Sequence, residues 1–286
     1  MIRVISAGMH SSIQDLGRFG FRNQGVPNSG SMDSISAKLA NSILNNKLNS
    51  ALLEITIIGP KLIFDTDTYI AITGANISPK LNNVAILNCK VIKVKKGDIL
   101  SFGKLLYGTR GYIAVYGGIQ SEVKLNSRCQ YTNITRESRL SKNDEIEINR
   151  LPNEIKLNHK GKIKSKFKYF EKNEISVFPG PEFELLSKNK QYKLLNTEFT
   201  ISNNSNRMGY RMEEVISKHS ISMITSPVMP GTVQLLPSGQ IVVLMKDAQT
   251  TGGYPRIFQL NELAICTMAQ KKVGDTFKLK LSPTQI

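Results

Sequence analysis

The sequence predicts a mainly β protein with a few short helices. Short runs rich in Ile, Val and Leu recur along the chain. Gly, Pro or Asn residues interrupt these runs every ~8–12 residues, a spacing typical of barrels and sandwiches. With 286 residues, 40% of them hydrophobic, the chain has enough apolar surface to form a folded core. This composition excludes a disordered chain and predicts one large domain or two smaller ones.

Each expected strand is a short apolar run that ends at turn residues. Residues 31–44 carry apolar side chains at helical spacing and predict a helix with Ser31 or Asp33 as its N-cap. The run from Asn261 to Gln270 fits a short helix and a strand equally well. In chain order the expected strands are Ala51–Ile58, Tyr69–Thr73, Val91–Val94, Ile99–Phe102, Tyr112–Val115, Ile175–Phe178, Ser220–Ile224, Val233–Leu236 and Ile241–Met245.

Two short patterns recur in the same order along the chain. The first is Arg-x-Gly-aromatic-Arg, at Arg18–Arg22 and again at Arg207–Arg211. The second is Gly-Asp before an alternating run, at Gly97-Asp98 and at Gly274-Asp275, with a weaker echo at Asn143-Asp144. Gly-Asp alone is ordinary hairpin chemistry. The two patterns together indicate two related β-rich halves.

Basic residues exceed acidic residues by 38 to 22, which gives a formal net charge of +16. They concentrate in residues 150–172, where lysines alternate with other residues from Lys160 to Lys168. This alternation favours a solvated linker, since no nucleic-acid-binding motif accompanies it. We therefore expect no nucleic-acid partner, and we expect the chain to divide near this linker into domains of residues 1–155 and 156–286.

The cysteines and the N-terminal residues predict a cytoplasmic protein. Cys89, Cys129 and Cys266 are far apart in the sequence, so neither a zinc site nor a disulfide framework is expected. The first residues lack the apolar segment of a signal peptide, and no apolar run is long enough to span a bilayer. We expect no metal site and no membrane partner.

Two segments are unusually dense in glycine and polar residues. The segment from Gln14 to Asp33 combines four glycines with arginines, whose planar guanidinium groups suit carboxylate or phosphate. The segment from Lys246 to Arg256 follows an apolar strand with a carboxylate, an amide, hydroxyls and two glycines, whose freed backbone amides can face an anion. On residue types alone, a purely structural role as elaborate turns explains the two segments as well as a binding role does. The loop at Gly97–Lys104 has the wrong spacing for a phosphate-binding loop.

Several motifs, taken in order along the chain, give a family resemblance. The motifs are Gln14–Gly20, Gly25–Asp33, Ala40-Asn41, Leu53–Thr56, Thr73–Ala75, Gly108–Gly118, Arg207–Arg211 and Asp247–Pro255. In this order they resemble the family once labelled allophanate hydrolase subunit 2. That family includes KipA proteins, the C subunit of bacterial 5-oxoprolinase (PxpC) and the biotin-dependent carboxyltransferase region of urea carboxylase. The resemblance covers nearly the whole chain.

The resemblance implies a fold, a reaction and partners. The implied fold is two cyclophilin-like β-barrel domains. The implied activity is that of one subunit in a complex that opens 5-oxoproline to glutamate with ATP as co-substrate, and no biotin is expected on this chain. The implied partners are a KipI/PxpB-like subunit and a LamB/YcsF (PxpA)-like subunit. The alternative is a KipA-like regulatory protein that binds a KipI-like inhibitor of a histidine kinase.

Within this resemblance we assign roles to individual residues. Asp247 is expected to orient or deprotonate a reacting group, with Arg18 and Arg207 as anion clamps. Asp33 is expected to contact substrate or to cap a helix, and Arg22 and Arg211 are left open between anion contact and a structural role. The other expected substrate contacts are Gln249, Thr250, Thr251, Gly252 and Gly253.

The chain departs from the family pattern in one region. Leu125–Arg128 has Asn126 where the family has glycine, Ser138-Arg139 stands for the usual Gly-Arg, and Asn143-Asp144 stands for Gly-Asp. The two segments that carry the expected site residues are intact.

Overall fold

The computed structural model describes residues 1–152 and 168–282 and divides them into two compact units. Unit 1 contains residues 1–18 and 29–152, and unit 2 contains residues 19–28 and 168–282. Both consist mainly of strands, so the predicted mainly β fold is confirmed. The expected domain boundary at residue 155 and the alternating lysines from Lys160 to Lys166 lie outside the described residues.

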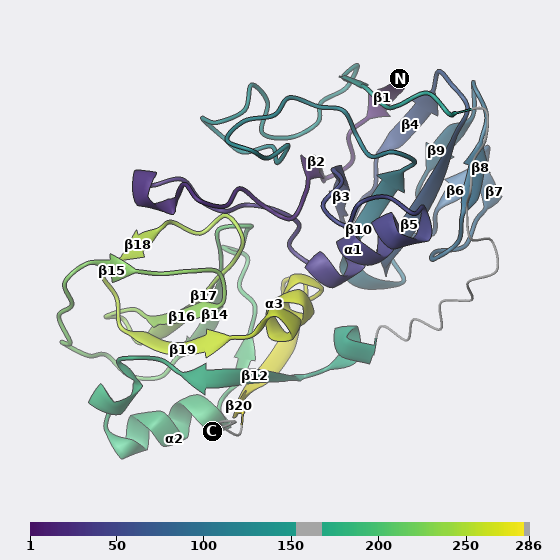
Figure 1. Ribbon diagram of the computed structural model, residues 1–286. Coiled ribbons are helices and arrows are strands. Elements are labelled where there is room, and N and C mark those ends of the chain that lie inside the picture. The colour runs from purple at the N-terminus through teal and green to yellow at the C-terminus, as the bar shows by residue number, and fades with distance from the viewer. Residues whose placement is uncertain (153–167, 283–286) are drawn as a thin grey trace. The chain divides into compact units, whose positions relative to one another are not determined.

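Unit 1 consists of two antiparallel sheets and one helix, α1 (Ser34–Ile43) (Figure 1). The order of the six-stranded sheet is β11 (Glu145–Ile146), β1 (Ile2–Ser6), β4 (Lys61–Phe64), β9 (Ile99–Ser101), β6 (Lys80–Leu81) and β7 (Val84–Ala85). The order of the five-stranded sheet is β2 (His10–Gln14), β3 (Leu52–Thr56), β10 (Tyr107–Val115), β5 (Thr68–Asn76) and β8 (Ile92–Val94).

Alternation along β3 builds the core of unit 1 on both faces of the five-stranded sheet. Leu53 and Ile55 belong to the large apolar cluster that also contains residues of β1 and β4. Leu52, one position away, belongs to a second cluster with residues of α1. Side chains two apart in a strand share a face, so Glu54 is on the α1 side with Leu52. The strand thereby places a carboxylate beneath the beginning of the helix.

Unit 2 is built on a seven-stranded sheet whose two edges meet. Its order is β13 (Glu198–Thr200), β20 (Thr276–Leu281), β12 (Glu174–Pro179), β19 (Arg256–Leu260), β16 (Thr232–Leu235), β17 (Gln240–Leu244) and β14 (Gly209–Val215). Only the β12–β20 pair of this sheet, among the residues described, is parallel. An antiparallel bridge joins Ile201 to Met212, and the Ser202 amide donates to the Arg211 carbonyl at 2.9 Å. These contacts link the β13 end of the sheet to β14, as a barrel requires.

A separate two-stranded ladder and short helices complete unit 2. The ladder pairs β15 (Ser226–Pro227) with β18 (Thr251–Gly252).

Asn261 caps α3 through its side chain, which accepts from the Ala264 amide at 2.8 Å, so the run from Asn261 to Gln270, left open between helix and strand, is a helix. No helix of residues 1–152 and 168–282 is long and apolar enough to cross a membrane. The helical segments of unit 2 are η1 (Arg22–Gln24), η2 (Lys168–Glu171), η3 (Phe183–Leu185), α2 (Lys188–Asn196) and α3 (Glu262–Ala269).

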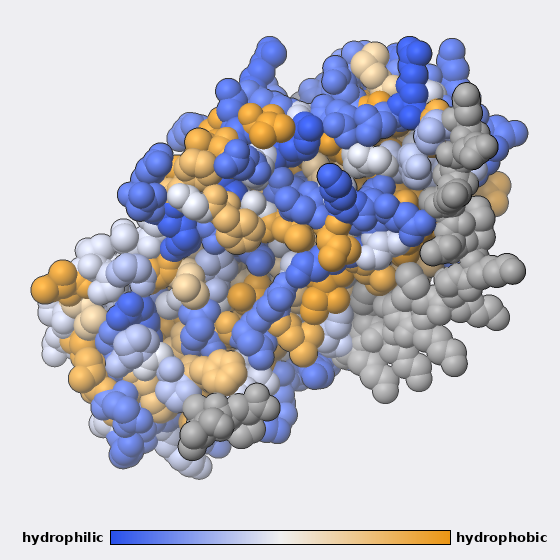
Figure 2. All heavy atoms as spheres, viewed as in Figure 1, coloured by the Kyte–Doolittle hydropathy of each residue, from blue (hydrophilic) through white to orange (hydrophobic). Residues whose placement is uncertain are grey.

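The strand expected at Ser220–Ile224 is wrong. This segment is irregular, and Ile224 is 89% exposed. Figure 2 shows hydrophobic residues at the surface where Figure 1 places the chain that leads into β15. The alternation of apolar and polar residues is present, but no described strand pairs with the segment, and pairing is what stabilises a strand.

The Gly-Asp pattern corresponds to one local turn that occurs three times. In each turn the aspartate Oδ2 accepts from the amide three residues earlier, at 2.8 Å in Asp98, 2.7 Å in Asp144 and 2.9 Å in Asp275. The preceding residue is left-handed each time, with φ of 90° at Gly97, 72° at Asn143 and 83° at Gly274. Asparagine tolerates this conformation, so the departure from Gly-Asp at Asn143-Asp144 preserves the turn.

The Arg-x-Gly-aromatic-Arg pattern has two different structures. Gly20 is left-handed, with φ of 92°, in the irregular segment before η1. Gly209 begins β14 and is not left-handed. The shared letters therefore do not reflect a shared backbone conformation at this position.

Candidate active site

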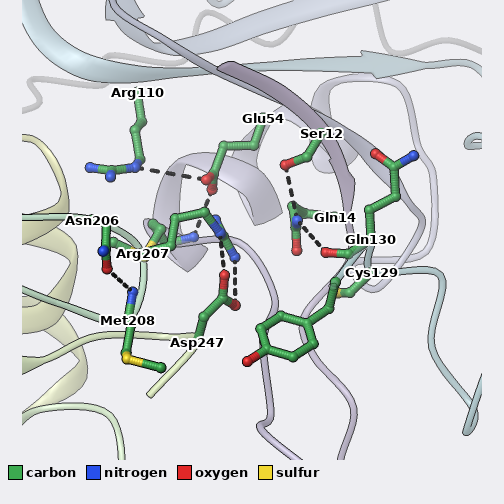
Figure 3. A network of polar contacts seen from close by, with 12 residues as sticks. Ser12, Gln14, Glu54, Arg110, Cys129, Gln130, Asn206, Arg207, Met208 and Asp247 are labelled. Atoms are coloured by element: carbon green, nitrogen blue, oxygen red, sulfur yellow. Dashed lines mark hydrogen bonds and ion pairs between the residues drawn. The ribbon is translucent and has the colours of Figure 1, made fainter. Parts of the chain in front are cut away.

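The strongest polar contact near the end of β17 is a two-point ion pair between Arg207 and Asp247 (Figure 3). Arg207 Nε donates to Asp247 Oδ2 at 2.7 Å, and Nη2 donates to Oδ1 at 3.1 Å. The two side chains are 11% and 12% exposed. This paired geometry is the strong form of an arginine–carboxylate interaction, and partial burial reduces its screening by solvent.

Backbone hydrogen bonds set the position of both partners. Asn206 Oδ1 accepts from the amides of Met208 and Gly209, at 2.8 and 3.4 Å, and forms the turn that carries Arg207. The Asp247 amide donates to the Arg207 carbonyl at 2.9 Å. The sequence predicted Asp247 at the end of a buried strand, and β17 ends three residues before it, at Leu244. Both partners lie in unit 2.

The Asp247 carboxylate has spare capacity to bind other groups. Within residues 1–152 and 168–282, the Arg207 guanidinium is the one side chain that hydrogen-bonds to it. An ionised carboxylate can accept about four hydrogen bonds. The arrangement can therefore hold the carboxylate in place while leaving lone pairs for water or a substrate N–H group.

The expected substrate contacts beyond Asp247 lie on and beside the small ladder. The Thr250 carbonyl accepts from the Val228 amide at 3.1 Å, and Thr251 lies exposed in β18. Among the residues described, neither Gln249 nor Thr251 makes a side-chain hydrogen bond. A Cβ atom at Gly252 would be too close to the Gln234 side chain, whereas one at Gly253 would meet its nearest atom, Thr225 Oγ1, at 3.9 Å. That these groups converge on one pocket with Asp247 stays a prediction.

Arg18 lies in unit 1 and is fully buried. Its Nε donates to the Lys124 carbonyl at 3.1 Å and its Nη2 donates to the Cys129 carbonyl at 2.8 Å. Nη1 is buried without a hydrogen-bond partner among the residues described. In the structure, Arg18 thus binds the backbone at both ends of the Lys124–Cys129 loop. Its role as an anion clamp stays a prediction.

The loop with the altered family motif is attached to the first glycine-rich segment through Asp15. Asp15 Oδ2 accepts from the Arg128 amide at 2.8 Å, and the Ser127 hydroxyl lies 2.9 Å from Oδ1. Burial, with the nearby Asp15 carboxylate, raises the pKa of the Cys129 thiol, which donates to Oδ1 at 2.8 Å. Asn126 has φ of 61°, a conformation that asparagine tolerates, so the replacement of glycine preserves this turn.

Asp33 is the N-cap of α1. Its Oδ1 accepts from the Ser36 amide at 3.0 Å and its Oδ2 accepts from the Ser36 hydroxyl at 2.7 Å. The side chain is fully buried. The structure therefore realises the capping alternative for Asp33, and a substrate contact stays untested.

A buried polar cluster around Glu54 was not assigned a role from the sequence. Glu54 Oε2 accepts from the Met32 amide at 2.7 Å and from the Tyr112 hydroxyl at 2.9 Å. Oε1 lies 3.7 Å from Arg110 Nε (Figure 3). Burial, then the Glu54 and Asp33 carboxylates, raise the pKa of Tyr112, so its hydroxyl remains a donor. A carboxylate within the apolar run Ala51–Ile58 was the available signal.

Unit 1 also has an open hollow of about 820 Å³ that contains none of the expected site residues. Its charged lining is mainly acidic, in contrast to the basic chain as a whole. No group of three or more His, Cys, Asp or Glu side chains suited to a metal ion occurs in the described parts of the chain. The acidic residues of the hollow are Glu122, Glu137, Asp144, Glu145 and Glu147.

Comparisons with known proteins give one consistent group of relatives. A family model for the carboxyltransferase domain, subdomains A and B, matches residues 24–281. The C subunit of the 5-oxoprolinase of Escherichia coli strain K12 is 33% identical over 279 residues, covering 96% of this chain and 89% of that protein. Its counterpart of the same name in Haemophilus influenzae is 31% identical over 296 residues, covering 98% of this chain and 91% of that protein.

A solved structure gives the same fold in a longer protein. The urea amidolyase of Kluyveromyces lactis superposes with a TM-score of 0.85 at 28% identity. The superposition covers 97% of this chain and 18% of that protein. This chain is therefore similar to one part of that enzyme and to nearly the whole of the two bacterial subunits.

Proposed function

We propose that this chain, which belongs to the carboxyltransferase domain (subdomains A and B) family, acts as the C subunit of an ATP-dependent 5-oxoprolinase. The observation that carries this proposal is the end-to-end similarity to two bacterial proteins of that name. The similarity to the urea amidolyase of Kluyveromyces lactis supports it less, because this chain corresponds to only a part of that protein. No observation favours the regulatory KipA-like alternative.

Opening a lactam with ATP makes definite chemical demands. Transfer of the γ-phosphoryl group of ATP to the lactam oxygen gives a phosphorylated imidate and ADP. Water then adds to the activated carbon, and the C–N bond breaks as the nitrogen takes a proton. A second water releases phosphate and leaves glutamate. The complex therefore needs a base or orienting carboxylate for water and cationic donors for the anionic oxygens.

We propose that the Arg207–Asp247 pair provides the base or orienting carboxylate. We assign the carboxylate of Asp247 to orienting or deprotonating a reacting group, and its unused lone pairs support this role. Arg207 donates to Asp247 through Nε and Nη2, so we assign it first to fixing the carboxylate. Its role as an anion clamp stays a proposal. A two-point contact restricts the carboxylate to one orientation, which is what a positioned base requires.

The loop that follows Asp247 is proposed to bind the substrate. Gln249 and Thr251 make no side-chain hydrogen bond within the described residues, so an amide and a hydroxyl are available to a cyclic amide. Gly253 is exposed and has no Cβ atom, which permits close approach of a substrate to its backbone. Thr250 acts through its carbonyl, which is held in place by the Val228 amide.

We further propose that ATP and the remaining catalytic groups come from partner subunits. The chain has no phosphate-binding loop, so we expect no ATP hydrolysis by the chain alone. The expected partners are a KipI/PxpB-like and a LamB/YcsF (PxpA)-like subunit. We propose that the Gln14–Asp33 segment contributes part of the contact surface for the KipI/PxpB-like subunit. Gln14, Arg18 and Asp33 are fully buried, and the exposed residues of the segment lie within residues 19–28.

Reconstitution with the two partner types tests the proposal. The chain is assayed alone, with each partner, and with both, and the release of ADP and glutamate from ATP and 5-oxoproline is measured. We expect coupled turnover only when all three are present. Robust ATP hydrolysis by the chain alone that partners do not change, or no turnover by the full set, would contradict it.

A further inference from the structure

Arg22 makes contacts that differ from those of the arginines already assigned. It lies in residues 19–28, the N-terminal segment that groups with unit 2. Its Nη2 donates to the carbonyl of Val228 and, at 3.2 Å, to the carbonyl of Thr250. The Gly25 amide donates to the Arg22 carbonyl at 3.0 Å, and Gly25 is left-handed, with φ of 78°. This tight turn holds the backbone from which the guanidinium extends.

The two carbonyls that Arg22 binds belong to the two strands of the small ladder. Val228 follows β15 directly and Thr250 precedes β18 directly. The ladder is not paired with the seven-stranded sheet and has two residues in each strand. A ladder of this length has few hydrogen bonds of its own, so a side chain that bridges its strands contributes a large share of its order.

The charge environment of Arg22 points to recognition of carbonyl groups and not to an ion pair. Within residues 1–152 and 168–282, its side chain is hydrogen-bonded to these two carbonyls, and no carboxylate pairs with it. Burial lowers the pKa of Arg22 from its usual value. Hydrogen bonds from a charged donor are stronger than neutral ones, and both of these go to the backbone of the loop.

We propose that Arg22 is a positioning residue that sets the location of the Thr250–Gly253 backbone for substrate binding. This inference rests on the proposed function in one respect, which is that the loop contacts the substrate. Arg22 does not itself touch the reacting atoms. It acts through the carbonyl of Thr250, the residue before the strand that presents Thr251 and Gly252.

The first test follows local order in the isolated chain. Backbone hydrogen exchange is measured for the wild type and for Arg22→Gln, Arg22→Lys and Arg211→Gln. Arg211 is the matched control, because it occupies the corresponding place in the second Arg-x-Gly-aromatic-Arg pattern and is exposed on β14. We expect Arg22→Gln to exchange about tenfold faster or more at residues 226–229 and 250–253, the scale for loss of a hydrogen bond from a charged group. Arg22→Lys recovers part of this protection, and Arg211→Gln leaves it unchanged.

The second test uses steady-state kinetics of the reconstituted complex. We expect Arg22→Gln to raise the KM for 5-oxoproline about tenfold with a much smaller change in kcat, since a misplaced loop weakens binding of the substrate. Equal exchange rates in Arg22→Gln and the wild type would overturn the proposal. Protection lost throughout unit 2, together with kcat, would also overturn it, because that result indicates a general structural role. A wild-type complex without turnover refutes the proposed function, while the exchange experiment still tests Arg22.

Discussion

Two arginine–carboxylate pairs, one from each unit, differ in what else binds the carboxylate. The Glu54–Arg110 pair of unit 1 is buried, and the Asp247–Arg207 pair of unit 2 is partly buried. In unit 2, Asp247 is bound at two points by Arg207, at 2.7 and 3.1 Å. In unit 1, Glu54 lies 3.7 Å from Arg110 and instead accepts short hydrogen bonds from the Met32 amide and the Tyr112 hydroxyl. Glu54 is fully buried, whereas the Asp247 side chain is 12% exposed.

The difference separates a carboxylate that holds the fold together from one that can react. Glu54 connects β3, β10 and the segment before α1, so its lone pairs are used by the surrounding protein. Among the described residues, the Asp247 carboxylate is held by the Arg207 side chain alone, so it can accept further hydrogen bonds. Charged groups at functional sites are commonly held in place and left accessible in this way. We therefore expect changes at Glu54 to affect mainly stability and changes at Asp247 to affect mainly turnover.

The largest expected loss of stability follows from Glu54→Gln. The amide retains one oxygen for the Met32 and Tyr112 donors but leaves the Arg110 charge without its carboxylate. Breaking a buried ion pair from one side costs about 3 kcal/mol. The free energy of unfolding from urea denaturation measures this cost. The control is the double variant Glu54→Gln with Arg110→Met, which should recover part of the lost free energy of unfolding. A Glu54→Gln variant as stable as the wild type would show that Glu54 does not hold unit 1 together.

Lys271 extends the comparison to a buried charge that is bound by no carboxylate of residues 1–152 and 168–282. It is 4% exposed, and its Nζ donates to Asn173 Oδ1 at 3.2 Å. Burial lowers the pKa of Lys271, an effect that Asp275 partly offsets. A lysine whose pKa is lower in the folded state binds its proton less well there, so stability rises with pH between the folded and unfolded pKa values.

Lys271→Met removes this buried charge. We expect the variant to be about 1 kcal/mol more stable than the wild type at neutral pH, because replacing a poorly compensated buried charge by an apolar side chain is often stabilising. The advantage should shrink as the pH approaches the unfolded pKa. Urea denaturation over a pH series measures it, with the exposed Lys278→Met as control. A difference that is independent of pH, or present in the control, would show that the charge of Lys271 is not the cause.

The smallest expected effect contrasts the two neighbouring glycines of the loop after Asp247. A Cβ atom at Gly252 would lie 2.5 Å from Gln234 Nε2, whereas one at Gly253 would meet its nearest atom, Thr225 Oγ1, at 3.9 Å. We expect Gly252→Ala to lower stability by about 1 kcal/mol, since Gln234 must shift, and Gly253→Ala to change it by less than about 0.5 kcal/mol. Thermal unfolding distinguishes them. Equal losses of stability in the two variants would contradict the view that crowding by Gln234 makes Gly252 less tolerant of a side chain than Gly253.

Local sequence patterns predicted the elements whose stability is local. The β-branched runs at β3 and β17 and the apolar spacing of α1 are visible in the sequence. Asp33, the observed cap, is one of the two caps predicted, with Ser31 the other. The failures have physical causes. Ser220–Ile224 alternates like a strand but has no partner among the described strands, and α2 buries only Gln191 and Leu194, too few residues to give a helical pattern.

A polar residue could be placed from the sequence only where neighbouring residues determine its position. The position of Asp247 just past a buried strand could be predicted, because only Lys246 separates it from the apolar run Ile241–Met245. The Glu54 cluster could not, because it depends on the register that places Tyr112 opposite Glu54 and on the approach of Met32 from a distant segment. The two carbonyls bound by Arg22 carry no side-chain signature, so no sequence motif identifies them.

The most direct test of the distinction between the two carboxylates is the turnover of a reconstituted complex that carries Asp247→Asn. The asparagine keeps the shape and one oxygen for Arg207 but removes the charge. We predict that the complex still assembles, with a melting temperature close to that of the wild type, and that turnover of 5-oxoproline falls at least ~100-fold, the scale of losing one positioned acid–base or electrostatic group. Parallel loss of stability and activity would instead assign Asp247 to bracing the turn, as Glu54 braces unit 1. An unchanged rate in a well-folded complex would contradict a reactive role and remove Asp247 from the site.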